Sequence, residues 1–230
     1  MRIFLFLSLF TFFSSTAFAQ TGGNWMPLFN GENLDGWTAS TENANSFFVE
    51  NGTLILKGGR AHLFYTGPDG AASFKNFELR LKIKTFNNAN SGVYFQTQYQ
   101  ESGWPEKGFE AQVNSTHTDP RKTGSLYGIV NIYSPGPEVE PYLVQVSENK
   151  EVFVYQKKAP SKDKKWFDYL IKVVDNTITI SVDGEIQTQW TQPQDWPQQG
   201  RSIGSGTVAL QAHDPGCEVH YKDIQLKVLD

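Results

Sequence analysis

The chain has 230 residues, a net charge of −4 and a single cysteine, Cys217. Such a mild acidic balance argues against nucleic acid or an anionic membrane surface as the main partner. One cysteine excludes an intrachain disulfide, so stability has to come from a packed core. The 17 Phe, 9 Tyr and 6 Trp residues supply large apolar side chains for it.

Residues 1–19 have the pattern of a secretory signal peptide. Arg2 is followed by the apolar run Ile3–Phe13 and by the small-residue cleavage site Ala17-Phe18-Ala19. The apolar run is shorter than the roughly 20 residues that a membrane span needs. We therefore expect export to the periplasm or outside the cell, a mature chain from Gln20, and no membrane association after cleavage.

The mature chain contains one strand pattern after another. Residues 77–84 alternate strictly, which directs Leu79, Leu81 and Ile83 to a buried face. Asp183-Gly184 is typical of a tight hairpin turn, and no long amphipathic helix is visible. We expect one all-β domain over residues 20–230, a sandwich or jelly roll of two antiparallel sheets. Residues 187–205 are expected to form a long loop.

The segment 107–127, KGFEAQVNSTHTDPRKTGSLY, is the most polar part of this pattern. On a strand, Glu110, Gln112 and Asn114 share one face, whereas Ala111 and Val113 face the core. Residues 115–125 are expected to form a loop. That loop carries His117, Asp119, Arg121 and Lys122. The pattern fits either a binding site built on a rigid strand or a solvated sheet face with an ordinary loop.

Five segments in order resemble the signatures of the 3-keto-disaccharide hydrolase family. They are PLFNGENLDGW (27–37), FVENGTL (48–54), NSGVYF (90–95), GFEAQV (108–113) and ALQAHDPG (209–216) with YKDI (221–224). The resemblance implies a concanavalin A-like jelly roll and a secreted bacterial protein that breaks down carbohydrate. It also implies cleavage of glycosides oxidised to a ketone at C3. Gln96 stands where relatives commonly have Arg or His.

An ordinary glycosidase needs two carboxyl groups beside the scissile bond. The strand Glu110-x-Gln112-x-Asn114 keeps only one, and an amide cannot act as a nucleophile. A ketone at C3 removes that requirement because it acidifies the hydrogen at C2. One base can then start an elimination that expels the leaving group from C1, and water can add to the product.

Several residues are candidates for this chemistry. His213 or His117 could be the base, with His213 the better choice because it ends a motif strand, and Glu110 a second base. Tyr127 could donate a proton, and Arg121 or Lys122 could stabilise the enolate. Candidates for binding sugar hydroxyls are Gln112, Asn114 and Gln96; His62 is a weaker candidate of the histidine kind. Each candidate also has a structural alternative. The histidines could cap turns, Glu110 could form an ion pair, the amides could line a hydrated sheet face, and the loop cations could simply be solvated.

Cofactor and function class stay open at this point. A divalent metal ion could polarise the ketone, with ligands among Glu110, His117, Asp119 and His213, although no tight motif such as H-E-x-x-H occurs. The expected partner is a carbohydrate, the oxidised glycoside. One alternative is a carbohydrate-binding module with Trp104 as its sugar platform. Another is a conventional hydrolase in which Asp119 or another remote acid supplies the second carboxyl group.

Overall fold

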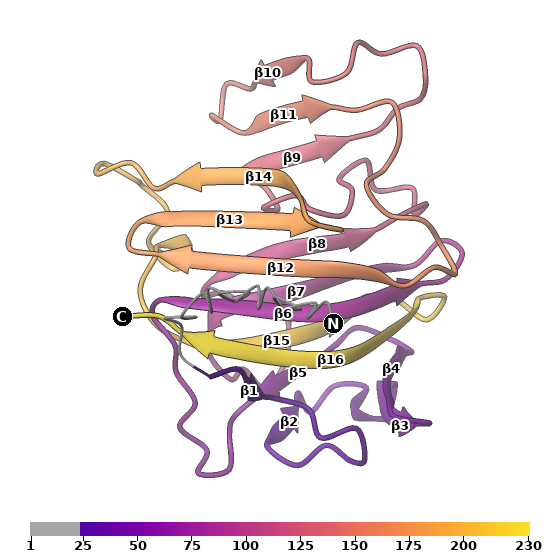
Figure 1. The fold of residues 1–230 in the computed structure, drawn as a ribbon, viewed down its shortest axis with the longest axis vertical. Helices are drawn as coiled ribbons and strands as arrows, with labels where there is room; N and C mark the ends of the chain where they lie inside the picture. Colours follow the sequence, from indigo (N-terminus) through magenta and orange to yellow (C-terminus); the bar gives the residue numbers. More distant parts are fainter. Residues whose placement is uncertain (1–23) are drawn as a thin grey trace, which may run out of the picture.

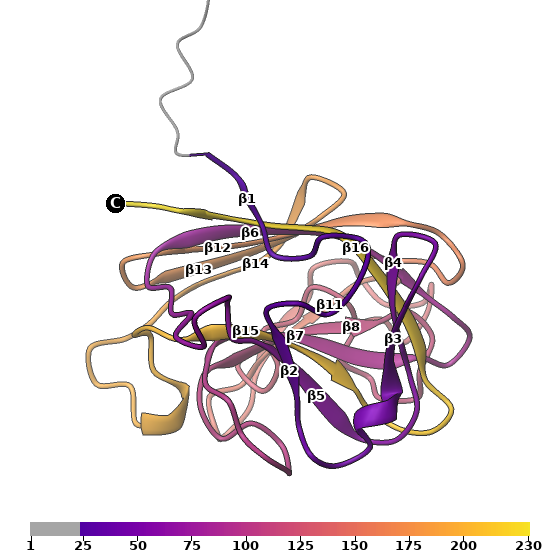
Figure 2. The ribbon, with the colours of Figure 1, turned by 90° about the horizontal axis from the view of Figure 1, so that it is seen from below.

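The computed structural model describes residues 24–230, most of which form two stacked antiparallel sheets, with a small third sheet beside them (Figures 1 and 2). The large sheet has the order β14-β13-β12-β6-β16-β4-β3, with β1 beside β16. Its strands are β1 (Met26–Pro27), β3 (Phe47–Glu50), β4 (Thr53–Lys57), β6 (Phe77–Thr85), β12 (Phe167–Val174), β13 (Thr177–Val182), β14 (Glu185–Thr191) and β16 (Glu218–Val228). The all-β prediction is confirmed, and the predicted signal peptide lies outside the described residues.

The second sheet has five strands in the order β2-β5-β15-β7-β8. Its strands are β2 (Trp37–Ala39), β5 (Ala61–Tyr65), β7 (Asn90–Thr97), β8 (Phe109–Asn114) and β15 (Thr207–Ala212). The only helices among residues 24–230 are two short 3₁₀ turns, η1 (Ala44–Ser46) and η2 (Gln199–Arg201). No helix in this part of the chain is long and apolar enough to cross a membrane.

The core lies between the two sheets and follows the period-2 alternation of the strands. On β6, the residues Leu79, Leu81 and Ile83 are at most 2% exposed, whereas Arg80 is exposed, as the sequence predicts. Across the gap, residues of the second sheet with the same inward orientation join the same apolar cluster. They include Leu63, Val93, Ala111, Val113 and Leu210.

The predicted turn at Asp183-Gly184 is confirmed. Both residues have positive φ angles, 48° and 83°, which suit a two-residue hairpin connection. The expectation of a loop over residues 187–205 was wrong in its first part, because β14 extends the hairpin to Thr191. Pairing such as Ile178↔Trp190 continues the ladder beyond a bulge at Ile180/Ser181.

The outer face of the second sheet is covered rather than open to water. Every residue of β7 and β8 is buried, on both faces of the sheet. Backbone hydrogen bonds attach neighbouring segments to β8 and to the residue before it, from Tyr127 N–H to the Glu110 carbonyl and from Gly108 N–H to the Gly200 carbonyl. Polar side chains on this face therefore have to find partners within the protein.

A third, three-stranded sheet extends the second one, at the top of Figure 1. It consists of β9 (Val130–Tyr133), β10 (Val144–Val146) and β11 (Val152–Tyr155) in the order β10-β11-β9. Isolated bridges Ala111↔Leu126 and Leu126↔Val130 connect it to β8. Residues 115–127 therefore run between the second sheet and this extension.

Candidate functional site

A cavity of about 220 Å³ opens on the outer face of the second sheet. It lies where three strands of that sheet meet the loops that cover them. Its lining residues are Asn90, Tyr94, Trp104, Pro105, Gly108, Glu110, Gln112, Asp119, Tyr127, Arg201, Gln211 and His213. Of the residues singled out from the sequence as catalytic, Glu110, Tyr127 and His213 line this cavity.

Glu110 is the buried carboxyl group of the cavity, with 8% of its surface exposed. The Tyr94 hydroxyl donates a hydrogen bond to its Oε2 (2.9 Å), and Gln211 Nε2 donates in turn to the Tyr94 oxygen (3.1 Å). Burial raises the pKa of Glu110 to about 7, against the opposing effects of the Tyr94 hydrogen bond and the Arg201 charge. Such a carboxyl group can donate a proton near neutral pH.

His213 is the histidine of the cavity. Its Nδ1 lies 3.0 Å from Asp214 Oδ2; since a carboxylate oxygen only accepts, the Nδ1–H group donates this hydrogen bond, and Nε2 of the neutral ring is then an acceptor. Burial alone would raise the pKa of Asp214, but hydrogen bonds from Cys217 and His213 hold it below its ordinary value. The Trp104 ring, 44% exposed, packs with its centroid 5.2 Å from that of His213.

His117 lies beside this pair but does not line the cavity. Its Nδ1 accepts the backbone N–H of Asp119 (3.0 Å), and its Nε2 lies 3.8 Å from Asp214 Oδ2. Burial lowers the pKa of His117. The ring therefore supports the loop and faces Asp214, in agreement with the turn-capping alternative.

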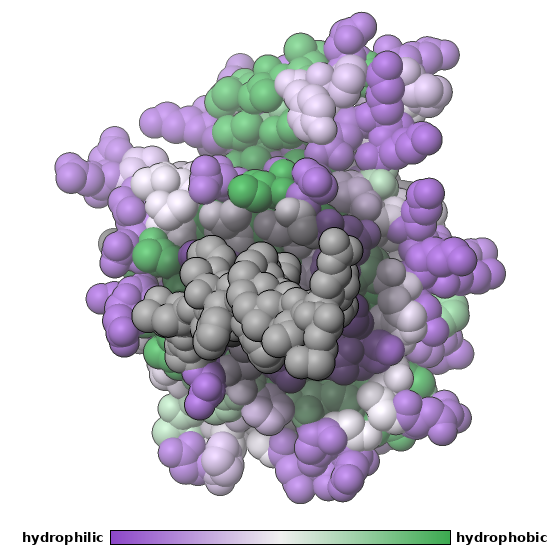
Figure 3. Space-filling model, viewed as in Figure 1, coloured by the Kyte–Doolittle hydropathy of each residue, from purple (hydrophilic) through white to green (hydrophobic). Residues whose placement is uncertain are grey.

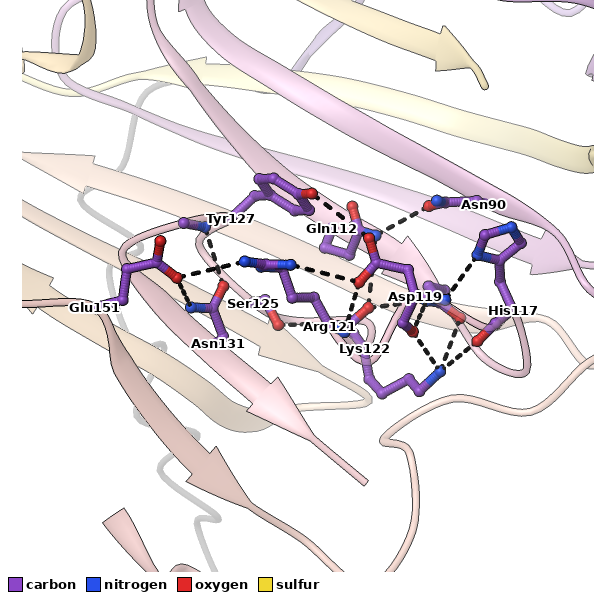
Figure 4. Close-up of polar contacts among 12 residues, drawn as sticks. Asn90, Gln112, His117, Asp119, Arg121, Lys122, Ser125, Tyr127, Asn131 and Glu151 are labelled. Atoms are coloured by element: carbon purple, nitrogen blue, oxygen red, sulfur yellow. Dashed lines mark hydrogen bonds and ion pairs between the residues drawn. The ribbon is translucent and has the colours of Figure 1, made fainter. Parts of the chain in front are cut away.

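Asn114 and Lys122 hold the same loop through hydrogen bonds to its backbone, and Figure 4 shows those of Lys122. Asn114 Nδ2 donates to the carbonyls of Asp119 and Arg121, both at 2.9 Å. Lys122 is 8% exposed, and its Nζ donates to the carbonyls of His117 (2.6 Å) and Asp119 (2.8 Å). Both side chains donate hydrogen bonds to carbonyl groups of the loop, and neither lines the cavity.

Asp119 brings a second carboxyl group to the cavity from the loop. Its Oδ1 accepts the backbone N–H of Arg121 (2.8 Å), and its Oδ2 lies 3.5 Å from the Tyr127 hydroxyl. Arg121 lies outside the cavity, with its guanidinium carbon 4.8 Å from the centre of the Tyr127 ring. Burial raises the pKa of Tyr127, so this hydroxyl keeps its proton and can donate it in a hydrogen bond.

The two glutamine candidates differ in position. Gln112 lines the cavity, and its Nε2 donates to Asn90 Oδ1 (2.9 Å). Gln96 is 1% exposed and does not reach the cavity. Its Nε2 donates to the carbonyls of Lys75 and Gly204, both at 2.9 Å, and its Oε1 accepts the Gly204 N–H. Gln96 therefore ties two loops together.

Sequence reasoning missed Tyr94, Arg201 and Gln211 as lining residues. Tyr94 and Gln211 lie within motif segments and follow the same alternation that identified Glu110. Arg201 is the last residue of η2, between β14 and β15, where no sequence pattern indicates it. His62 is fully buried, and within residues 24–230 neither ring nitrogen has a hydrogen-bond partner; burial lowers its pKa to about 4.

A metal ion has one candidate position within residues 24–230, where His213, Asp214 and Cys217 offer ligand atoms within 4.8 Å of one another. This differs from the expected ligand set and shares only His213 with it. In the structure these donors are already hydrogen-bonded to one another: His213 Nδ1 and Cys217 Sγ both lie 3.0 Å from Asp214 Oδ2, and Cys217 Sγ accepts the Asn90 N–H.

Known structures share this fold. A protein provisionally described as a glycosyl hydrolase from Parabacteroides distasonis superposes with a TM-score of 0.61 at 19% identity, covering 90% of this chain and 94% of that one. The carbohydrate-binding module CBM66 from Bacillus subtilis gives 0.53 at 12% identity, with 85% and 97% covered. An endo-β-1,3-glucanase from Pyrococcus furiosus gives 0.51 at 13%, with 84% and 88% covered. These likenesses confirm the predicted jelly-roll fold.

The family comparison is more specific than the structural ones. Among curated proteins, none matches this sequence. The model of the 3-keto-alpha-glucoside-1,2-lyase-like domain matches residues 24–227, nearly all of the described chain. The resemblance seen in the five sequence motifs is thereby confirmed, and with it a role in carbohydrate chemistry. The chain belongs to the 3-keto-alpha-glucoside-1,2-lyase-like family.

Proposed function

We propose that the protein is an enzyme that cleaves glycosides carrying a ketone at C3, by removal of the C2 proton and elimination at C1. One observation carries this proposal. A cavity of about 220 Å³ is lined both by a carboxyl group whose pKa is about 7 and by a histidine oriented by an aspartate. A proton donor and an imidazole that can accept a proton thus line the same cavity.

The steps follow from the positions of these groups. His213 Nε2 takes the proton from C2, and the electron pair of that C–H bond forms an enolate with the C3 oxygen. Arg201, the cation among the lining residues, stabilises the enolate oxygen. The enolate then re-forms the ketone and a C1–C2 double bond as the C1–O bond breaks. Glu110 donates its proton to the departing oxygen, and water adds to the unsaturated product.

The residues beside Glu110 support this route over double displacement. The neighbouring position on the same strand face is Gln112, which has no acid–base function and is bonded to Asn90. Asp119 is the other carboxyl group of the cavity, and its oxygens already face the Arg121 N–H and the Tyr127 hydroxyl. A conventional hydrolase with Glu110 as acid and Asp119 as base is the second candidate, favoured by their common cavity.

The test compares an aryl glucoside with its 3-keto derivative, using mature protein with and without a chelator. Release of the aryl alcohol from the keto form alone supports the proposal, and Glu110→Gln should reduce it about 100-fold or more. The matched control is Glu185→Gln, which removes an exposed carboxyl group on β14. Release from the unoxidised glucoside would instead favour the conventional hydrolase. Sugar binding without release from either would favour a binding module.

Export is part of the same proposal, since the signal-like segment precedes a domain of this family. Mass spectrometry of protein recovered from the periplasm or culture medium should find Gln20 as the first residue. A chain that stays in the cytoplasm with residues 1–19 attached would contradict it.

A further inference from the structure

The cavity is too small for a whole glycoside. Its volume of about 220 Å³ is below the ~300–1,000 Å³ of pockets that enclose drug-sized ligands, and it suits about one sugar ring. If that ring is the one that reacts, the group attached at C1 has to lie outside, on the neighbouring surface. The surface that continues from the cavity therefore decides which leaving groups bind.

A continuous row of side chains leads from the cavity wall to the three-stranded extension. Tyr127 lines the cavity, and the Arg121 guanidinium lies over its ring at 4.8 Å. Arg121 also pairs with Tyr133 of β9 through a backbone bridge, and its Nη2 lies 3.5 Å from Glu151 Oε2 (Figure 4). Asn131 Nδ2 donates to the same Glu151 oxygen (3.0 Å). The extension is thus connected to the cavity wall through Arg121 and Tyr127.

Beyond Arg121, three aromatic rings form one cluster, here called the aromatic platform: Tyr133, Phe153 and Tyr155. The Tyr133 ring centre lies 5.0 Å from that of Phe153 and 5.7 Å from that of Tyr155. Strand register places all three on the face that also carries Asn131 and Gln145. All three rings are half-buried, so each keeps exposed surface.

The opposite face of the same strands already provides the apolar attachment to the body. Val152 and Val154 pack against the main core from that face. Val144 and Val146, which share it by register, are 55% and 64% exposed. Figure 3 shows hydrophobic residues gathered over this extension. The aromatic platform therefore lies on the side of the extension that faces away from the core, and it is not needed to anchor these strands.

We propose that the aromatic platform is the binding position of the sugar ring that leaves from C1, the second ring of the disaccharides after which the family is named. The apolar C–H face of a sugar packs against an aromatic ring, while the hydroxyl groups at its edge form hydrogen bonds with polar side chains. Such side chains border the platform: Tyr155 O–H donates to the exposed Gln145 Oε1 (3.1 Å), and the half-buried Glu151 accepts from Arg121 and from the fully buried Asn131. This inference rests on the proposed function and adds to it a binding position for the leaving group.

The test uses Phe153→Ala and Tyr155→Ala with two 3-keto substrates, one with methanol and one with glucose as the leaving group. For the disaccharide we expect kcat/KM to fall about tenfold in each variant, and for the methyl glycoside less than twofold. Val146→Ala, on the opposite face, should change neither. Phe153→Leu keeps the apolar bulk without the ring and should behave like Phe153→Ala.

Two results would overturn the proposed role of the platform: an equal loss of kcat/KM on both substrates, or no loss of kcat/KM on the disaccharide. If the wild-type protein turns over neither substrate, the proposed function fails and binding is measured instead, by calorimetric titration with the unoxidised disaccharide. Binding that weakens about tenfold in Phe153→Leu but not in Val146→Ala would still support the platform. Absence of binding to the wild-type protein, or binding unchanged in Phe153→Leu, would overturn it.

Discussion

The carboxyl group of Glu110 lies directly against Gly92 on the neighbouring strand. A Cβ atom added at Gly92 would overlap Glu110 Oε1 and lie 2.7 Å from its Cγ. Since the φ angle of Gly92 is not positive, the requirement is space and not backbone conformation. The missing side chain lets the carboxyl group lie along the sheet, where Tyr94 donates to it.

Replacing Gly92 with alanine should therefore displace the Glu110 carboxyl group. We expect kcat to fall about tenfold or more, with a loss of about 1–3 kcal/mol in the free energy of unfolding from the added methyl group. Steady-state kinetics and denaturant unfolding measure the two effects. Gly204→Ala is the control, since a Cβ there meets nothing closer than 4.0 Å. Full activity in Gly92→Ala would show that the position of Glu110 is not critical.

Much of the fold was predictable because alternation and turn chemistry are local. The strict pattern of β6 and the Asp183-Gly184 turn each identify a strand or hairpin without reference to the rest of the chain. The extent of β14 was not predictable, because Gln187–Thr191 have few apolar residues. That segment is held by pairing with β13, a tertiary contact that the local sequence does not show.

The candidate site was predictable only in part, for a similar reason. Alternation places Glu110 and Gln112 on one face, but it cannot say which polar residues face a ligand and which bind loop carbonyls. Asn114 and Lys122 do the latter. Gln96 turns away because its backbone adopts a positive φ of 51°, next to Gly206, the residue before β15. Arg201 reaches the cavity from a distant loop.

The titration of Glu110 should make stability depend on pH. The folded-state pKa of about 7 exceeds the ordinary value of 4.5, so the folded protein binds more protons than the unfolded chain between these values. The free energy of unfolding should therefore fall as pH rises from 4.5 to 7, by roughly 3 kcal/mol at most. In Glu110→Gln this fall should be absent. Urea unfolding at pH 4.5 and pH 8 measures the difference, and parallel changes in both proteins would contradict the assignment.

Arg201 should control both that titration and the reaction. Its charge opposes the effect of burial on Glu110, and its Nη1 donates to the Tyr127 carbonyl (2.9 Å). Arg201→Met should raise the pKa of Glu110 further, so the decline of kcat/KM above about pH 7 should move to higher pH. Turnover should also fall about tenfold or more, because the enolate loses its cation. Arg201→Lys keeps the charge and should retain the original pH profile. An unchanged pH profile in Arg201→Met would show that the charge of Arg201 does not affect the pKa of Glu110.

The two neighbouring histidines should differ sharply in their effect on turnover. His213 lines the cavity with Nε2 available as an acceptor, whereas His117 uses Nδ1 for the Asp119 N–H and supports the loop. We expect His213→Ala to lose about 100-fold or more in kcat, and added imidazole to restore part of it by occupying the vacated space. His117→Ala should lose less than tenfold, gain nothing from imidazole, and show its main effect as lower thermal stability. A larger catalytic loss in His117→Ala than in His213→Ala, or rescue of His117→Ala by imidazole, would transfer the role of base to His117.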